Sequence, residues 1–563
     1  MDTQNPEYDL KSVKLPYLSG QALRLFVGAL ESPMQTFLLP NLFKSAGITE
    51  WRKLHFNEAP LMEPIHYVSN PADVTARIAK QEWPEISSDG GLGFHFASVH
   101  DYARAYRDGE ISPLDVAERV LKAIEASNSI DPPLRAIIAV IREDVERQAR
   151  ESTKRFQEGR PLSVFDGVPV AIKDELDMEP YPTTVGTAFL GTKPTEQDST
   201  VVARMRAAGS LLIGKANMHE IGIGVTGLNP HHGTARNPYN PAHYTGGSSS
   251  GPAAATAAGL CPVAIGADGG GSIRIPASFC GLVGLKPTYG RVSEFGAAPL
   301  TWSMAHLGPL AVKAVDAALA YAVLAGPDVK DPHSLHQPAP TLAGWDHLDL
   351  SDLTMGVYWP WFRHATAEVV KACERMLEVL QGCGAKLKEV TIPDLEAARV
   401  AHTVTIAGEI NQALDWAYED HHKEYCLEVR ANLALARQFT SGDYLKSQQV
   451  RARLMGTCQR ILKDVDVIIS PATAVAAPPI PAKALPDGES DLSTLVEIMR
   501  FATPANLTGM PAISFPAGYT GAGLPVGLQA MGRPWQETTL LRLALAAEQH
   551  MERRAPKIQY PIL

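Results

Sequence analysis

The segment GPAAATAAGLCPVAIGADGGGSIRIPAS, residues 251–278, indicates the architecture of the chain. Its first ten residues are small and apolar, as in a closely packed helix, and CPVAIGAD (261–268) has the pattern of a buried strand. Three glycines then precede Ser272. Glycine lets the backbone approach another group closely, so the run predicts either a packing turn or a cradle of N–H donors. These residues alone leave both interpretations open.

Helix and strand patterns alternate on both sides of that segment. Strand patterns occur at 167–175, 211–214, 464–470 and 511–532, and helix patterns at 199–210, 365–382 and 405–438. No repeat of fixed period is present. This alternation predicts an α/β fold built on a layered sheet.

The chain divides at about residue 98. SPLD (112–115) is a capping box with proline at the first helical position, and it opens a helix that ends near Ser127. We expect one large domain at 99–563, with helical additions, and an N-terminal extension at 1–98. The opening residues MDTQNPEYDL contain no basic stretch followed by an apolar run, so we expect no signal peptide.

Two amphipathic helices are expected within residues 18–45 of the extension. The apolar residues are Leu23, Phe26, Val27 and Leu30 in the first helix and Met34, Phe37, Leu38 and Phe43 in the second. These helices either pack on the body or on a sister subunit, or touch a membrane surface or an oily substrate. The polar face is not especially basic, which weakens the peripheral-membrane interpretation. The uncharged run Ser32–Phe43 is shorter than the roughly 20 residues of a spanning helix.

Composition excludes several function classes. The net charge of −10 is spread along the chain, and no basic stripe indicates a nucleic-acid partner. The six cysteines are scattered without a CxxC pair, which argues against a zinc knuckle or a redox couple. We expect buried free thiols in a reduced, cytoplasmic compartment.

Several short motifs match known patterns but lack their context. GIGVTG (222–227) does not lie between a strand and a helix, and GSLLIGKA (209–216) ends in Ala216 where a P-loop needs Ser or Thr. GSSSG (247–251) follows a loop, so Ser249 is a poor candidate for a nucleophile elbow. The histidine pairs 231–232 and 421–422 lack metal-ligand spacing. We expect no metal and no cofactor.

Lys173 and Ser272 carry the candidate chemistry. Lys173 ends the apolar run GVPVAIK, and burial lowers the pKa of a lysine, so that its amine can act as a base. The alternative is a salt bridge with Asp174 or Glu175. Around Ser272, convergent glycine N–H groups could form an oxyanion hole, and a pair between Asp268 and Arg274 could brace the loop.

Residues 246–288, GGSSSGPAAATAAGLCPVAIGADGGGSIRIPASFCGLVGLKPT, resemble the amidase signature family over its diagnostic segment. DGVPVAIKD, GKANMHE, NLTGMPAISFPAG and GLPVGLQAMGRPW agree as well, so the resemblance covers roughly 100–560. It implies a large mixed sheet surrounded by helices. It also implies a Ser–Ser–Lys triad in which Ser272 is the acylated nucleophile, Ser248 the bridging serine after a cis peptide, and Lys173 the base.

The resemblance further implies an oxyanion hole made by the amides of Gly269, Gly270, Gly271 and Ser272. Many members carry Thr-Asp-Thr before the Gly-Gly-Ser, whereas Ala267 and Gly269 stand in the threonine places here. A side-chain hydroxyl beside the loop is therefore lost, and the rigidity of the loop is in question.

The N-terminal segments and the run from Met499 to Trp535 look most like plant-type fatty acid amide hydrolases. That similarity implies N-acylethanolamines or other fatty amides as substrates, a homodimer, and N-terminal helices near the substrate entrance. It also places Gly222 and Thr226 near the substrate. The alternatives are an amidase of smaller or aryl amides or of carbamates, a glutamine amidotransferase component, and a non-catalytic binding module.

Overall fold

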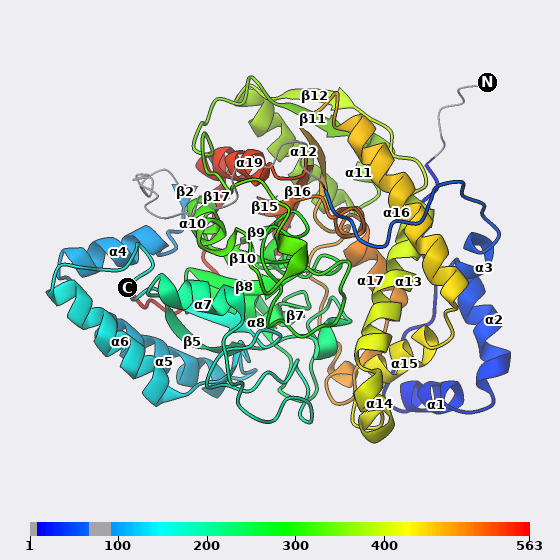
Figure 1. The fold of residues 1–563 in the computed structure, drawn as a ribbon, viewed down its shortest axis with the longest axis horizontal. Coiled ribbons are helices and arrows are strands. Elements are labelled where there is room, and N and C mark those ends of the chain that lie inside the picture. The colour runs from blue at the N-terminus through cyan, green and yellow to red at the C-terminus, as the bar shows by residue number, and fades with distance from the viewer. Residues whose placement is uncertain (1–7, 67–91) are drawn as a thin grey trace.

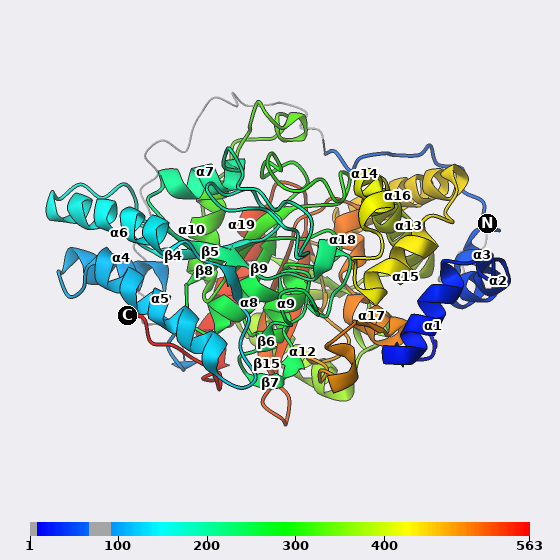
Figure 2. The same cartoon turned by 90° about the horizontal axis from the view of Figure 1, so that it is seen from below.

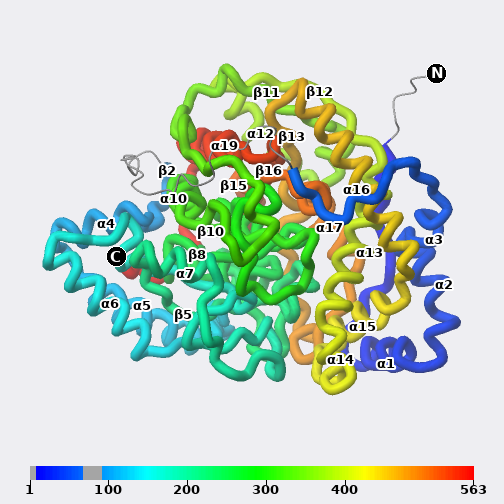
Figure 3. The backbone as a smooth tube through the Cα atoms, viewed as in Figure 1, coloured from blue at the N-terminus to red at the C-terminus, as the bar shows by residue number. Residues whose placement is uncertain are grey.

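A large mixed sheet forms the centre of the molecule (Figure 1 and Figure 3). The computed structural model describes residues 8–66 and 92–563; the predictions for the first seven residues and for 67–91 of the extension lie outside the described residues. The eleven strands are, in spatial order, β12 (Lys386–Glu389), β11 (Thr354–Val357), β13 (Val467–Pro471), β16 (Pro525–Gly532), β15 (Ala512–Tyr519), β9 (Val283–Lys286), β10 (Leu307–Ala311), β8 (Val263–Ala267), β4 (Pro169–Lys173), β5 (Leu211–Ala216) and β3 (Ile137–Ala139).

Parallel pairing of β4 with β8 brings the candidate chemistry to one edge of the sheet. Ile172 pairs with Ile265 in this ladder, and β5 lies parallel to β4 on its other side. Strands β10, β9, β15 and β16 are joined by antiparallel ladders. The carboxyl ends of parallel strands meet at the same edge, which is where ligands bind in open α/β sheets. Lys173 and the loop after Ala267 therefore lie side by side.

Helices cover both faces of the sheet (Figure 2). They are α4 (Val99–Arg107), α5 (Pro113–Ser129), α6 (Arg142–Gln157), α7 (Thr200–Ala207), α8 (Ser250–Ala257), α9 (Arg274–Phe279), α10 (Ala314–Leu324), α11 (Trp359–Phe362), α12 (Ala367–Gly382), α18 (Thr503–Leu507) and α19 (Glu537–His550). The strands β4 and β8 are buried along their whole length, as their continuous apolar sequences predict. The predicted α/β fold with a large mixed sheet is confirmed.

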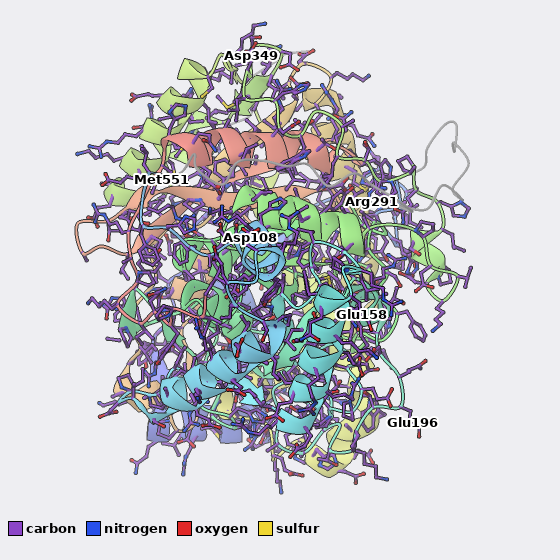
Figure 4. All side chains as sticks on the ribbon, turned by 90° about the vertical axis from the view of Figure 1, so that its left-hand side faces the viewer. Asp108, Glu158, Glu196, Arg291, Asp349 and Met551 are labelled. Atoms are coloured by element: carbon purple, nitrogen blue, oxygen red, sulfur yellow. The ribbon has the colours of Figure 1, made fainter. Side chains whose placement is uncertain are left out.

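Local sequence signals account for several of these helices. The capping box predicted at Ser112 is present, with Asp115 as its partner. Figure 4 views the side formed by α4, α5 and α6, and labels Asp108 and Glu158 at the carboxyl ends of α4 and α6. Helix α8 consists of small residues because it approaches the sheet closely: a Cβ atom on Gly251 would lie 2.2 Å from the backbone nitrogen of Asn217.

A further group of helices lies beyond one end of the sheet. These are α13 (Leu395–Ala413), α14 (Asp415–His421), α15 (Leu427–Ala436), α16 (Ser441–Ile461) and α17 (Leu492–Met499). The helix pattern predicted at 405–438 is therefore divided, and its first helix starts earlier, at Leu395. The residues between α14 and α15, 422–426, are not helical. At the end of this segment the Cys426 N–H donates to the buried carboxylate of Glu220 at 3.0 Å. A contact between distant segments thus sets this boundary.

The N-terminal helices lie at the opposite end of the molecule from α4–α6 (Figure 1 and Figure 2). They are α1 (Gly20–Leu30), α2 (Gln35–Ser45) and α3 (Ile48–Trp51). Leu23, Val27 and Leu30 of α1 are buried against α15, so the first helix packs on the body. Leu25 and Phe37, by contrast, are 77% and 81% exposed. No helix in residues 8–66 and 92–563 is both long and apolar enough to cross a membrane.

Short elements connect the remaining segments. They are β1 (Leu18–Ser19) paired with β14 (Glu489–Ser490), β2 (Leu92–Gly93) paired with β17 (Glu552–Arg553), β6 (Arg236–Asn237) paired with β7 (Asn240–Tyr244), and the 3-10 turns η2 (Glu220–Gly222), η3 (Pro332–Ser334) and η4 (Ala482–Ala484). The helix predicted from residue 18 starts at Gly20 because Leu18 and Ser19 pair with β14. The six cysteines are free thiols, and five of them are buried.

Candidate active site

Lys173 is the last residue of β4, and its side chain is buried at the edge where β4 and β8 end. Its Nζ atom lies 2.8 Å from Ser248 Oγ and 3.4 Å from the carbonyl oxygen of Ala267. A third contact joins Nζ to Glu175 Oε2 at 2.6 Å. The salt bridge that was the alternative interpretation of this lysine is therefore present together with the contact to Ser248.

The carboxylate that pairs with Lys173 belongs to Glu175, because Asp174 points elsewhere. Successive side chains at the end of a strand project to opposite faces. Asp174 accepts hydrogen bonds from Thr184 and from the Gly186 N–H, and it lies 3.5 Å from the Nζ atom of Lys215 on β5. Two adjacent carboxylates thus serve two different buried lysines.

Ser248 lies in the loop that leads into α8. The peptide bond between Gly247 and Ser248 is cis, as the family resemblance implied. Gly222, with φ +68°, packs against this serine: a Cβ atom built on it would lie 3.6 Å from Ser248 Oγ. Thr226 lies further along the same loop, where its hydroxyl accepts a hydrogen bond from the Leu228 N–H at 3.4 Å. Gly222 therefore lies beside Ser248, whereas the hydroxyl of Thr226 is bound to the backbone of its own loop.

Ser249 has a structural role. Its hydroxyl donates to the carbonyl oxygen of Ala267 at 3.2 Å and accepts from the Ala267 N–H at 3.4 Å. These bonds tie the Ser248 loop to the end of β8. The serine that the GSSSG motif singled out is thus fully engaged with backbone and is unsuited to act as a nucleophile.

Ser272 lies in the glycine-rich loop after β8 and is 5% exposed. Its backbone carbonyl accepts a hydrogen bond from the Ser249 N–H at 3.3 Å, which holds the two serine loops together. Its Oγ atom makes no hydrogen bond with any residue in 8–66 or 92–563, and this includes Ser248. The structure brings Lys173 to Ser248 and places the Ser272 loop beside them, with the Ser272 hydroxyl left unpaired.

The side chain of Asp268 holds the glycine-rich loop of Ser272 in place. Its carboxylate accepts from the N–H groups of Gly271 at 2.6 Å and Ile273 at 3.2 Å, and from Arg274 Nε at 3.0 Å. Arg274 also donates to Asn506 and Gln529, both at 2.6 Å. Burial opposes ionisation of Asp268, but Arg274, Lys286 and Asn506 together outweigh it and hold the pKa of that carboxyl well below its usual value. The predicted Asp–Arg pair is present and belongs to a larger buried network.

The glycines of the loop are required for space. A Cβ atom on Gly270 would lie 2.8 Å from the ring of His402, and one on Gly271 would lie 2.5 Å from Ile275 Cδ1. The Gly271 N–H donates to Asp268 at 2.6 Å, which leaves the amides of Gly269, Gly270 and Ser272 as candidate donors of the expected oxyanion hole. Those three N–H groups have no acceptor among the described residues. This corrects the predicted donor set: Gly271 serves the brace.

The structure shows which groups lie near Ala267 and Gly269, the two positions where the family carries threonine. Thr301 Oγ1 lies 3.2 Å from the place where a Cβ atom of Gly269 would be, so a hydroxyl from another segment occupies that space. Ala267 is held through its backbone by Ser249 and Lys173. The hydrogen bonds of the Ala267 backbone thus hold the start of the loop where the family carries the first threonine.

Several contributors to the site were not identified from the sequence. Asn506 and Gln529 lie inside the quoted motifs NLTGM and GLQAMG, but nothing in those motifs indicates contact with Arg274. His402 Nε2 lies 3.0 Å from the carbonyl oxygen of Gly269, and burial lowers the pKa of His402 to about 4. No sequence pattern marks this residue, because it comes from the middle of helix α13.

A cavity of about 210 Å³ adjoins the site. Glu175 lines it together with the apolar side chains of Leu300 and Leu307 and with Thr301. Leu300 also packs against Gly222 beside Ser248, so the cavity lies next to the candidate reacting groups. The lining of the cavity is mixed: apolar side chains lie beside three carboxylates (Glu175, Glu294 and Asp331), Lys330 and His333.

Comparison with known proteins is consistent with this geometry. Residues 117–541 match the family model described as amidase. The chain belongs to the amidase family. Fatty acid amide hydrolase of Medicago truncatula is 39% identical over all of this chain and 98% of its own length. A glutamyl-tRNA(Gln) amidotransferase component of Carboxydothermus hydrogenoformans is 33% identical over 82% of this chain and 98% of its own length.

A solved structure gives the same result at the level of the fold. A protein studied for the evolutionary origins of an s-triazine catabolic enzyme superimposes with a TM-score of 0.75 at 30% identity, over 81% of this chain and 99% of its own. As a member of the amidase signature family, this protein is a hydrolase of amide bonds.

Proposed function

We propose that this amidase hydrolyses fatty acid amides, such as N-acylethanolamines, through an acyl-enzyme formed on Ser272. The observation that carries the proposal is the 2.8 Å contact between the buried Lys173 Nζ and Ser248 Oγ, beside the glycine-rich loop of Ser272. A lysine and a hydroxyl in hydrogen-bond contact away from water are the arrangement that activation of a serine requires.

The proposed roles follow from these positions. Ser272 Oγ attacks the amide carbonyl carbon as its proton passes to Ser248, and the proton of Ser248 passes to Lys173. The N–H groups of Gly269, Gly270 and Ser272 are the candidate donors to the oxyanion. The proton then returns through Ser248 to the leaving amine, and water hydrolyses the ester on Ser272.

The fatty-amide substrate is supported by the extent of the similarity. The fatty acid amide hydrolase of Medicago truncatula aligns with the whole chain, which includes the N-terminal helices. The amidotransferase component leaves about a fifth of the chain unmatched. Leu300 and Leu307 give the cavity an apolar portion that suits an acyl chain, beside the charged side chains that also line it. Smaller or aryl amides and carbamates are the alternative substrates.

A hydrolysis panel tests the proposal. N-acylethanolamines of several chain lengths are compared with aryl and short aliphatic amides, and we expect kcat/KM to be highest for long acyl chains. Ser272→Ala should abolish turnover and labelling by a fluorophosphonate probe while substrate still binds. Preference for short or aryl amides would contradict the substrate, and near-normal turnover of Ser272→Ala would contradict the nucleophile.

We also propose that the exposed apolar side chains of the N-terminal helices contact the lipid phase in which such substrates dissolve. Leu25 on α1, Met34 directly before α2 and Phe37 on α2 are 77%, 60% and 81% exposed, and buried residues of α1 anchor this segment to the body. Sedimentation with vesicles should fall when Leu25 and Phe37 are changed to Ser. Light scattering on the same samples tests the expected homodimer, and a lower mass of the double variant would favour a dimer contact instead.

A further inference from the structure

Lys173 is fully occupied as a hydrogen-bond donor in this structure. An ammonium group has three N–H donors and no acceptor. Nζ has three oxygen partners: Ser248 Oγ at 2.8 Å, Glu175 Oε2 at 2.6 Å and the Ala267 carbonyl at 3.4 Å. In that state the lysine donates to Ser248 and has no lone pair with which to accept its proton. Before Lys173 can act as a base, one of its protons must move.

Only one of the three partners can accept that proton. The Ala267 carbonyl is a backbone amide, and Ser248 is the group that has to lose a proton. Glu175 provides a carboxylate, 5% exposed, in the shortest of the three contacts. We propose that Glu175 is the terminal proton acceptor of the site, so that the relay runs Ser272, Ser248, Lys173, Glu175. This inference rests on the proposed function.

The proton balance of the step closes. The ion pair of Lys173 and Glu175 becomes a neutral amine and a carboxylic acid as one proton crosses the 2.6 Å contact. Ser272 Oγ forms its bond to the carbonyl carbon, the C=O electron pair moves to oxygen, and the two serine protons shift toward Lys173. When the C–N bond breaks, a proton returns through Ser248 to nitrogen, and Glu175 gives its proton back to Lys173.

Other acidic groups lie beside Glu175. Glu175, Glu294 and Asp331 line the same cavity. Burial together with Asp331 and Glu175 raises the pKa of Glu294 well above its usual value. The other titratable groups that face this region are Lys330 and His333 in the cavity and His219 near Lys173; burial lowers the pKa of His219 to about 3.

The variant Glu175→Gln tests the relay, because it keeps the size of the side chain and removes proton acceptance. We expect kcat to fall at least tenfold at neutral pH with little change in KM. The acidic limb of the kcat–pH profile should move to higher pH, since Lys173 must then lose its proton to solvent. Asp174→Asn is the matched control: it removes the adjacent carboxylate, which lies 3.5 Å from Lys215 Nζ and outside the cavity, and the profile of the folded variant should keep the wild-type shape.

The opposite result has a distinct signature. If Glu175 only holds Lys173 charged, its removal makes the lysine easier to deprotonate, and the acidic limb moves to lower pH with kcat unchanged or raised. That outcome overturns the relay. Glu175→Asp, which keeps a carboxylate, should retain the wild-type profile at reduced kcat; an upward shift of its acidic limb would also contradict the proposal. Ser272→Ala is measured in parallel, and activity in that variant would instead reject the proposed function.

Discussion

Two adjacent parallel strands, β4 and β8, end at the same edge of the sheet, and each positions residues of the candidate site in a different way. Strand β4 presents Lys173 as its last residue, followed by Asp174. Strand β8 is followed by Asp268, and the serine comes four residues later in a glycine-rich loop. At each end an aspartate is used for support: Asp174 faces Lys215, and Asp268 faces Arg274.

The difference lies in what fixes the reacting group. A strand determines the direction of its side chains through the sheet ladder, so pairing with β5 sets the direction of Lys173, and the contact with Glu175 then holds its amine. The Ser272 loop has no ladder, and its shape depends on the Asp268 carboxylate, which accepts two backbone N–H groups and the Arg274 guanidinium. We therefore expect the loop at β8 to be more sensitive than the end of β4 to loss of its supporting aspartate.

The largest effect is expected from Lys173→Met, which removes the candidate base from the end of β4. We expect kcat/KM to fall by about 10²- to 10⁴-fold, the usual contribution of a general base. Lys215→Met is the matched control, since this buried lysine of β5 binds the Leu176 carbonyl and Thr183 and lies away from Ser248. Folded Lys215→Met protein should keep most of its activity; an equal loss in both variants would remove the distinction between the two lysines.

The next effect concerns the brace at β8. Asp268→Asn leaves the Arg274 guanidinium buried without its anion, and breaking a buried pair costs about 3–5 kcal/mol of the free energy of unfolding. Because the pKa of Asp268 is held below its unfolded value of 3.8, its contribution is complete above that pH and is lost as the pH falls. Chemical denaturation from about pH 2 to 7 should show a constant difference between the two proteins above about pH 5 and a smaller one below about pH 4. A difference that stays constant over the whole range would contradict the charge-based brace.

The sequence was sufficient for the parts of the site that lie on regular elements. The apolar run ending at Lys173 indicates a buried strand with a charge at its end, and the helix and strand patterns around Ser272 locate the glycine-rich loop between them. The family resemblance supplied Ser248, which no periodicity marks. The division of the helices near 405–438 could not be predicted, because it depends on a hydrogen bond from Cys426 to Glu220.

The choice of partners inside the site also lay beyond the sequence. Both Asp174 and Glu175 were candidates to pair with Lys173, and only the direction of the chain after β4 decides in favour of Glu175. The Gly271 N–H was expected to face the substrate, but the fold uses it to hold Asp268. Contacts of this kind are made between segments far apart in the chain, and local pattern does not encode them.

The loop itself offers a comparison of two glycines. Gly271 has φ +113°, and a Cβ atom there would lie 2.5 Å from Ile275 and 2.7 Å from Ala502. Overpacking and the positive φ together should cost about 2–4 kcal/mol in Gly271→Ala. Gly269→Ala is the control, since its Cβ atom would only approach Thr301 Oγ1 at 3.2 Å. Thermal unfolding of both variants checks this; equal destabilisation would mean that space in the loop is not what Gly271 provides.

The smallest effect is expected from the aspartate after β4. In Asp174→Asn the hydrogen bonds from Thr184 and Gly186 are impaired, which should cost about 1–3 kcal/mol of the free energy of unfolding. The loss stays below that of Asp268→Asn because burial lowers the pKa of Lys215, which can become neutral when its anion is removed. Arg274 cannot lose its proton in the same way. Denaturation of the two variants at pH 7 compares them directly, and a larger loss for Asp174→Asn would contradict the greater sensitivity expected of the loop after β8.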